Sequence, residues 1–366
     1  MKNTKSFFYL LLAVSTLIVS CGADDEKGSA ACNSDFDQQA LFVNVADNFI
    51  VPGYEIMLGK LDDLQSKTTA FTSAPDQATL KELRDAYLSA YVEFQKIAPY
   101  EFGPAESVFL RMSLNNFPTN SSEIENRIEA NNTDFSQPES YNKGFPALDY
   151  LLYGVAENDE SIVDKLGNQE NYKNYLVAVV TDMKERVDQT LAEWKGGYRE
   201  SFVENTGTAA GTSLSLIVNG LNENFELIKR EKIGIPSGVL TLDFVNPTKV
   251  EAYYSGNSVL LARTALEATK NLYKGSDGIG LDDYLQDVRA MKGDGTLDEA
   301  IQVQFATMIT AVSELNDPLS EAIDTDPDPV VAAYNEISKQ VVNLKTDLPS
   351  VLCVSITYID NPSDSD

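Results

Sequence analysis

Apolar residues recur at steps of three and four along most of this chain. The clearest stripes are Leu80-Leu83-Tyr87-Tyr91-Phe94-Ile97, Tyr172-Leu176-Val180-Met183-Val187-Leu191-Trp194, Leu214-Ile217-Leu221-Phe225-Ile228 and Leu297-Ile301-Phe305-Met308-Val312. That spacing places each set on one face of an α-helix several turns long. Sustained alternation of apolar and polar residues, which would indicate strands, occurs only in the short stretch 354–360. The chain is therefore predicted to be all-α, built from bundled helices.

Breakers in the sequence suggest how the helices are divided. A first long helix is expected from about Asp37 to beyond Leu64, bent at Pro52-Gly53 because proline removes a backbone donor. A chain of 366 residues is longer than one hydrophobic core usually serves. The long irregular stretch 234–258 is the expected division. We predict a first helical-bundle domain over 35–235 and a second over 236–366, although helices could cross between them.

The first residues have the features of an export signal. Residues 1–20 combine two lysines with an apolar stretch too short to span a bilayer comfortably. The stretch ends Ile-Val-Ser-Cys21, which resembles the lipobox of bacterial lipoproteins, whose cysteine is lipidated. An ordinary signal peptide with a chance cysteine is the alternative. Residues 21–34 form an acidic tether that resembles the tag of some surface-exported lipoproteins. We expect an envelope lipoprotein anchored in the outer membrane, facing the periplasm or the outside.

Charge and composition exclude several classes of function. The formal net charge is −28, so the chain should repel nucleic acid, and no nucleic-acid partner is expected. The chain has no histidine, which excludes His-based zinc sites and Ser-His-Asp or Cys-His catalysis. Any chemistry would have to use carboxylates, tyrosines, hydroxyls or the backbone.

Two cysteines remain once Cys21 is assigned to a lipid. Cys32 and Cys353 lie near the two ends of the mature chain. In an exported protein this count is compatible with one disulfide between them. Spacing alone leaves that pairing open.

The stretch "NKGFPALDYLLYG", residues 142–154, has the pattern of a helix start with a candidate ligand pair. Proline is accepted in a first helical turn, where its missing N–H would have had no partner. Asp149 follows Pro146 by three residues, so both lie on one side of the helix, one turn apart. An acid in a first turn also simply favours the helix dipole, which is the alternative to a binding role.

This stretch resembles the signature of the imelysin family, Gly-x-His-x-x-Glu followed by an apolar helix. Gly144 matches the glycine, Pro146 stands at the histidine, and Asp149 stands at the glutamate.

Other segments resemble the same family, and the likeness extends from about Asp35 to the end of the chain. Gly103 and Pro104 in "APYEFGPAESVFL" are similar to its Phe-Gly-Pro-Ala turn, and Tyr254, Ser255 and Ser258 are similar to its second-domain helix start. Each has a simpler interpretation: a helix-start turn for the Gly-Pro pair, helix caps for the serines, and a packed aromatic for the tyrosine.

The resemblance implies two helical-bundle domains, related by an ancient duplication, with a site in the cleft between them. It also implies a classification as a metallopeptidase and a link to bacterial iron uptake. This chain departs from that pattern because Pro146 cannot coordinate a metal and Asp149 is shorter than glutamate. A metallopeptidase needs several ligands and an open coordination position.

We therefore expect a lipoprotein that binds a ligand or a partner protein of an iron-uptake system in the cleft, and does not cleave peptides. An iron or other divalent metal ion is the expected cofactor if there is one, with Asp149 as the candidate ligand. A peptidase that uses only carboxylate ligands is the alternative function. A member that retains only the fold is a third.

Overall fold

The computed structural model describes residues 34–137 and 141–358 and confirms the predicted all-α class. The first half contains α2 (Gln38–Val45), η1 (Ala46–Ile50), α3 (Val51–Ser73), α4 (Gln77–Ile97), η2 (Ala98–Tyr100), α5 (Pro104–Ser107), α6 (Leu110–Leu114), α7 (Ser121–Glu129), α8 (Gly144–Asp149), η3 (Tyr150–Gly154), α9 (Asp159–Asn168), α10 (Glu170–Glu193), η4 (Trp194–Tyr198) and α11 (Arg199–Glu204). The second half contains α12 (Ser213–Leu227), η5 (Ile228–Gly234), η6 (Pro247–Lys249), α13 (Ser258–Lys274), α14 (Leu281–Asp287), β1 (Met291–Lys292), β2 (Gly295–Thr296), α15 (Leu297–Ser313), α16 (Leu319–Thr325), α17 (Asp328–Val341), η7 (Val342–Asp347) and α18 (Leu348–Leu352). The two short strands pair with each other, antiparallel.

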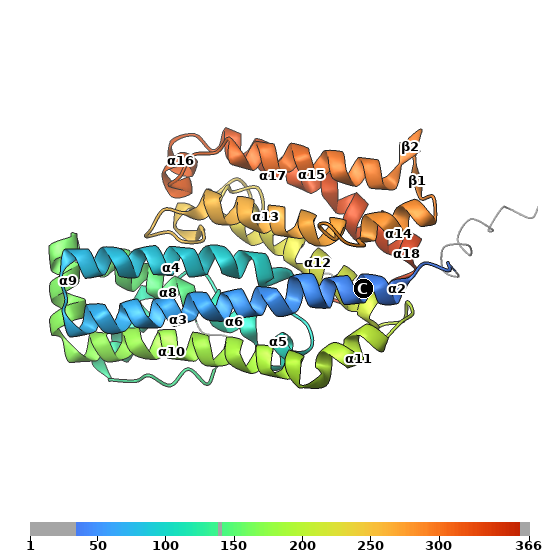
Figure 1. Cartoon of the computed structure of the whole chain (residues 1–366). Helices are drawn as coiled ribbons and strands as arrows, with labels where there is room; N and C mark the ends of the chain where they lie inside the picture. The colour runs from blue at the N-terminus through green and yellow to red at the C-terminus, as the bar shows by residue number, and fades with distance from the viewer. Residues whose placement is uncertain (1–33, 138–140, 359–366) are drawn as a thin grey trace, which may run out of the picture.

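The helices form two layers (Figure 1): one contains α3, α4 and α10, and the other contains α13, α15 and α17. In one layer α3 packs between α4 and α10, and in the other α13 and α17 both pack against α15. The layers meet where α4 contacts α13. The predicted domain boundary falls directly after η5. Because α12 contacts both η2 and α13, it packs against both layers, whereas η5 contacts α13 and α17 of the second layer.

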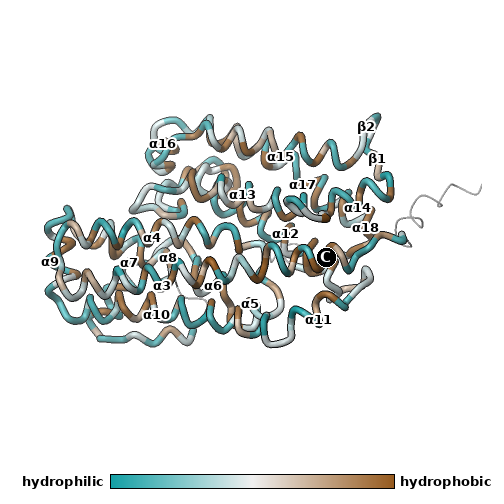
Figure 2. Tube along the Cα trace, viewed as in Figure 1, coloured by the Kyte–Doolittle hydropathy of each residue, from teal (hydrophilic) through white to brown (hydrophobic). Residues whose placement is uncertain are grey.

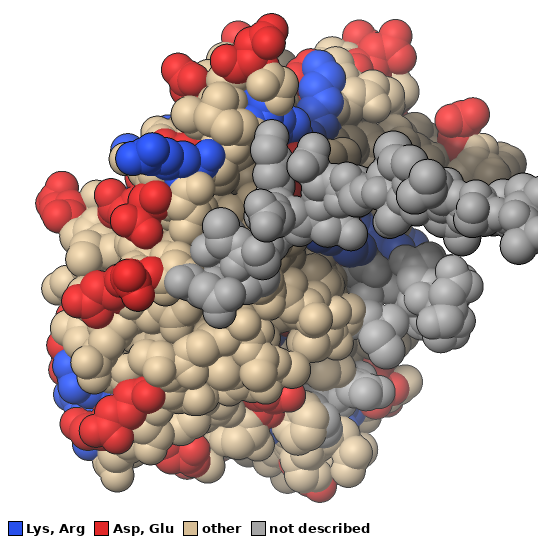
Figure 3. Space-filling model, turned by 90° about the vertical axis from the view of Figure 1, so that its right-hand side faces the viewer, with Lys and Arg blue, Asp and Glu red and all other residues tan. Residues whose placement is uncertain are grey.

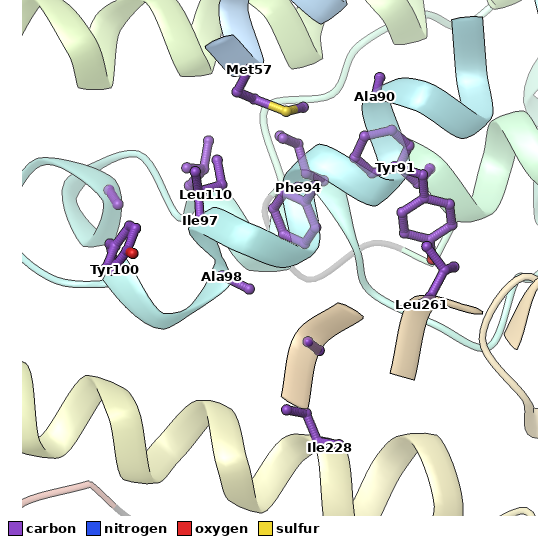
Figure 4. Packing of buried hydrophobic residues seen from close by; sticks show 14 of the residues in the cluster. Met57, Ala90, Tyr91, Phe94, Ile97, Ala98, Tyr100, Leu110, Ile228 and Leu261 are labelled. Carbon is purple, nitrogen blue, oxygen red and sulfur yellow. The ribbon is translucent and has the colours of Figure 1, made fainter. Parts of the chain in front are cut away.

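One continuous hydrophobic core runs through both layers. In Figure 4, Phe94 and Ile97 of α4 lie between Met57 of α3 on one side and Ile228 of η5 and Leu261 of α13 on the other. Figure 2 shows that apolar residues recur along each helix, as the sequence stripes require. The α4–α13 boundary is therefore buried, so polar groups placed there need partners within the protein.

The predicted bend near Pro52 takes a specific form. Residues Ala46–Ile50 form the π-helical segment η1, directly before the proline in the first turn of α3. Because proline has no N–H to donate to the preceding turn, the backbone there cannot keep the ordinary α-helical ladder. A local π-helical turn accommodates the missing bond.

Acidic side chains are spread over the surface, as the net charge requires. Figure 3 shows them scattered over one face, with fewer basic groups among them. Within the described parts of the chain, no helix is both long and apolar enough to cross a membrane.

Candidate functional site

The motif helix α8 begins at a glycine that no other residue could replace without strain. Gly144 has φ +67°, and a Cβ atom there would lie 2.2 Å from the carbonyl oxygen of Leu114. The close approach to the end of α6 therefore fixes where α8 starts. Pro146 follows in the first turn, and Thr119 Oγ1 donates a hydrogen bond to its carbonyl oxygen at 2.9 Å. Local backbone packing accounts for the glycine at position 144.

Asp149 links α8 to the irregular segment that precedes α13. Its side chain is 1% exposed. Its carboxylate accepts hydrogen bonds from the backbone N–H of Tyr254 at 2.7 Å, the N–H of Ser255 at 3.1 Å and the hydroxyl of Tyr87 at 3.0 Å. Burial raises the pKa of Asp149, and the hydrogen bonds it accepts oppose that shift. The motif carboxylate therefore fixes the second-half segment against the motif helix.

The donor set at α8 does not fit a metal ion. Pro146 offers no side-chain ligand, and both oxygens of Asp149 already accept hydrogen bonds. Among residues 34–137 and 141–358, no group of three or more His, Cys, Asp or Glu side chains is arranged to hold a metal. The ligand role of Asp149 stays a prediction, while its geometry supports a positioning role.

A second buried carboxylate at the same boundary has a cation beside it. Glu251 is 1% exposed and forms an ion pair with Lys232 of η5, which is 6% exposed. Gln95 of α4 accepts a hydrogen bond from Lys232 Nζ at 2.9 Å and donates one to Glu251 at 3.1 Å. Asn115 Nδ2 donates to Glu251 at 2.7 Å, and the hydroxyl of Tyr91 donates to Asn115 at 2.6 Å. Four separate segments thus meet in one polar network, which we call the Lys232 network: Tyr91, Gln95, Asn115, Lys232 and Glu251.

A cavity of about 350 Å³ opens beside this network. We call it the Lys232 pocket. Its lining is part polar and part apolar: Phe94, Gln95, Ala98, Arg111, Met112, Asn115, Asn116, Phe117, Tyr141, Asn224, Leu227, Glu231 and Lys232. Its volume falls at the lower end of the range for small-molecule sites.

Each ionic group that lines the pocket is paired with a group outside the lining. Lys232 pairs with Glu251, and Arg111 pairs with Glu223 at 2.6 Å. Burial lowers the pKa of Lys232, and the Glu251 charge opposes that shift. Lys232 Nζ has three N–H groups and Asn115 Nδ2 has two. Two of the Lys232 N–H groups and one of the Asn115 N–H groups donate hydrogen bonds to described residues, and the Lys232 ammonium also lies 5.6 Å from the centroid of the Phe117 ring. The second Asn115 N–H has no hydrogen-bond acceptor among the described residues, so it remains for a ligand.

The predicted site residues fall into two places. Asp149 accepts hydrogen bonds from the backbone of Tyr254 and Ser255, and the Ser258 hydroxyl donates to the carbonyl of Glu251 in the same segment. The Tyr254 ring packs edge-on against that of Tyr150, at 5.2 Å between centroids. The first N–H groups of α13 are accepted by Asp317, so the two serines do not cap that helix.

Gly103 and Pro104 lie elsewhere, at the start of α5. Gly103 has φ +58°, and a Cβ atom there would lie 2.3 Å from the Tyr198 hydroxyl oxygen. Pro104 is the first residue of α5. The pair therefore forms a turn covered by Tyr198, as the simpler interpretation states.

Two of the cysteine predictions lie outside the described residues. Cys21 and Cys32 precede Ser34, the first described residue. Cys353 is disulfide-bonded. Its pairing with Cys32 stays a prediction.

Sequence reasoning missed the Lys232 network. Lys232 lies in the charged run "IKREKIG", which resembles a solvated helix face, and Gln95 interrupts no apolar stripe. The one available signal was Glu251, three residues before the Tyr254 of the recognised segment.

Comparisons with known proteins identify relatives that match most of the chain. A model of the imelysin family (Peptidase M75) matches residues 50–344. A protein named as an iron-regulated protein A precursor, from Parabacteroides distasonis, has a crystal structure that superposes with a TM-score of 0.72 at 18% identity, covering 86% of this chain and 95% of that one. An imelysin-like protein from Psychrobacter arcticum gives 0.70 at 17% identity, covering 89% and 99%. No curated protein matches the chain. At these identities the two structures show a shared fold.

Proposed function

This chain belongs to the imelysin family, and we propose that it is a cell-envelope lipoprotein that binds a small ligand in the Lys232 pocket as part of iron or metal uptake. The single observation that carries the proposal is that pocket, about 350 Å³ beside a buried polar network at the boundary between the layers. The name of one structural neighbour, an iron-regulated protein A precursor, supports the link to iron.

The proposed activity is binding without proteolysis. The chain has no histidine, Pro146 occupies the position of the family histidine, and Asp149 accepts three hydrogen bonds. The residues of the Lys232 network are fixed by hydrogen bonds that cross between the layers. A site whose polar groups are already oriented loses little freedom on binding.

A binding measurement with a pocket-filling variant tests the proposal. Asn116 lines the pocket, so Asn116→Trp should fill it from the rim. Asn126→Trp is the matched control, because Asn126 is exposed on α7. Radioactive iron supplied as ferric citrate would be measured by equilibrium dialysis against purified protein. We expect retention by the natural protein and by the control, and at least roughly tenfold weaker retention by Asn116→Trp, about 1.4 kcal/mol. Equal retention by both variants would exclude this pocket.

A peptidase assay tests the alternative directly. The same purified protein would be incubated with fluorescently labelled casein and zinc, iron or manganese salts. We expect no cleavage above the protein-free control. If the protein cleaves casein, and both a chelator and Asp149→Ala abolish the cleavage, the proposed binding function would be wrong and the protein would be a peptidase.

The envelope location rests on the first residues and has its own test. Cys21→Ala should move the protein from the membrane fraction to the soluble envelope fraction, because it removes the proposed site of lipidation. Unchanged partitioning into detergent would contradict the lipid anchor.

A further inference from the structure

The segment that leaves η5 carries a group of exposed apolar side chains. Leu242 is 88% exposed and Phe244 is 74% exposed, the highest values for large hydrophobic residues in the described chain. Leu240 and Val245 beside them are also exposed. We call residues 240–245 the apolar tip. Exposed clusters of this kind on a soluble protein mark interaction sites.

The apolar tip is held rigid by its own hydrogen bonds. Asn246 Nδ2 donates to the Phe244 carbonyl at 2.6 Å and to Thr241 Oγ1 at 3.0 Å. The hydroxyl of Thr241 also donates to the Phe244 carbonyl, at 2.6 Å. The Asp243 N–H donates to the Gly238 carbonyl at 3.0 Å. The exposed side chains are therefore presented by a fixed backbone, so binding through them would cost little ordering entropy.

The backbone of the apolar tip is strained where the leucine is presented. Leu242 has φ +55° and Asp243 has φ +64°. Asp tolerates the left-handed region, but a bulky residue such as leucine rarely adopts it. Strain of this kind persists only where the surroundings fix it, and it is concentrated at functional positions.

Charge decides which occupant fits the apolar tip. Asp243 lies between Leu242 and Phe244, is exposed, and forms no ion pair with any described residue. Insertion of the two apolar side chains into a bilayer would carry this carboxylate toward the hydrocarbon, which is unfavourable. A protein surface with apolar sockets on either side of a basic group would satisfy all three side chains.

The position of the apolar tip agrees with a protein partner. In Figure 1 the segment between α12 and α13 lies at the end of the upper layer where η6 contacts α16, away from α2 and the first described residue. In the chain, residues 233–239 separate the tip from Lys232 of the pocket.

We propose that the apolar tip docks a protein partner whose surface places a basic side chain between two apolar sockets, one for Leu242 and one for Phe244. The carboxylate of Asp243 pairs with that basic side chain. Central apolar anchors give most of the affinity of such contacts, and the ion pair gives specificity. This docking does not require the ligand pocket to function as proposed.

The test compares three variants of a protein that also carries Cys21→Ala, so that no lipid anchor contributes. Leu242→Ser with Phe244→Ser removes the anchors, and Asp243→Lys reverses the charge. Val303→Ser is the matched control, because Val303 is 62% exposed on the regular helix α15. Proteins retained from solubilised envelopes of the source cells by the natural tip would be identified and purified. Their affinity for each variant would then be measured by calorimetry.

We expect one purified partner that binds the natural tip and the Val303→Ser control equally. Its affinity should fall at least roughly tenfold in both tip variants, about 1.4 kcal/mol each. Thermal unfolding of all variants should be similar, since these side chains are exposed. A partner unaffected by Asp243→Lys, or no partner sensitive to the tip, overturns the proposal. If the natural protein floats with phosphatidylcholine vesicles and the double serine variant does not, the tip contacts a membrane instead. If analytical sedimentation shows a dimer of the natural protein and a monomer of the same variant, the tip binds a second copy of this chain instead.

Discussion

Asp149 and Glu251 are both 1% exposed at the boundary between the layers, yet different groups stabilise them. Asp149 has no cation within hydrogen-bonding distance among the described residues, and it accepts from two backbone N–H groups and a tyrosine hydroxyl. Glu251 accepts from the ammonium group of Lys232 and from two amides. Asp149 belongs to the motif by which the family resemblance is recognised, and Glu251 does not.

The difference indicates which of the two could take part in binding. Every donor around Asp149 is a fixed part of the protein, so this carboxylate fixes the backbone of the segment before α13. Lys232, Gln95 and Asn115 around Glu251 also line a cavity, and some of their N–H groups have no partner in the described residues. The motif therefore positions the segment that holds Glu251, and the Lys232 network faces the ligand space.

The largest effect is expected when the ion pair is broken from one side. Lys232→Met should lower the free energy of unfolding by about 3–5 kcal/mol, because Glu251 would remain buried without its cation. Urea unfolding followed by circular dichroism measures this loss. The double change Lys232→Met with Glu251→Gln should recover most of it. A double variant as unstable as the single one would show that the charges are not coupled.

Removing the motif carboxylate should have a somewhat smaller effect. Asp149→Ala leaves two backbone N–H groups and the Tyr87 hydroxyl buried without an acceptor, at about 1 kcal/mol or more each, or about 3 kcal/mol together. The control is Asp85→Ala, because Asp85 is an exposed acid of α4. Proteolysis should cleave the segment 250–257 faster in Asp149→Ala than in the control. Equal stability of the two variants would refute the positioning role.

The sequence predicted the helices better than the partners of the site residues. Apolar stripes are set by packing against one core, so α4, α10, α12 and α15 follow their stripes. Spacing placed Asp149 at a functional helix start. Spacing could not show that the carboxylate of Asp149 accepts a hydrogen bond from the backbone N–H of Tyr254, 105 residues further along the chain. Lys232 was unrecognisable for the same reason, since the burial of a charged run depends on contacts with α4 that no local pattern contains.

Pro146 should matter less than Asp149, although both belong to the recognised motif. Pro146→Ala removes two buried ring methylenes and restores freedom to the unfolded chain, for a total loss of about 1–2 kcal/mol. The hydrogen bond from Thr119 to the carbonyl at this position would remain. Urea unfolding of Pro146→Ala and Asp149→Ala in the same experiment compares their losses of unfolding free energy. A larger loss in Pro146→Ala would mean that the ring, and not the carboxylate, fixes α8.

A third carboxylate near the pocket refines the comparison through its pH dependence. Both oxygens of Glu101 accept the backbone N–H of Arg111, each at 3.0 Å, while the Arg111 guanidinium pairs with Glu223. Burial raises the pKa of Glu101 to about 7, against the opposing charge of Arg111. The Arg111 charge and its backbone N–H both favour the ionised form of Glu101, but burial outweighs them, so ionisation should cost stability.

The sign of the effect follows from proton binding. Between the ordinary glutamate pKa of 4.5 and about 7, the folded protein holds a proton on Glu101 that the unfolded chain has lost. Stability should therefore fall as the pH rises through this window, by at most about 1.4 kcal/mol per pH unit. Glu101→Gln retains an acceptor for Arg111 but cannot ionise, so its unfolding free energy should fall less over the same window. The raised pKa of Asp282, about 6, affects both proteins equally and cancels in the difference. Parallel pH profiles for the two proteins would show that Glu101 is ionised throughout, and that the charge and the backbone N–H of Arg111 together offset the effect of burial on this carboxylate.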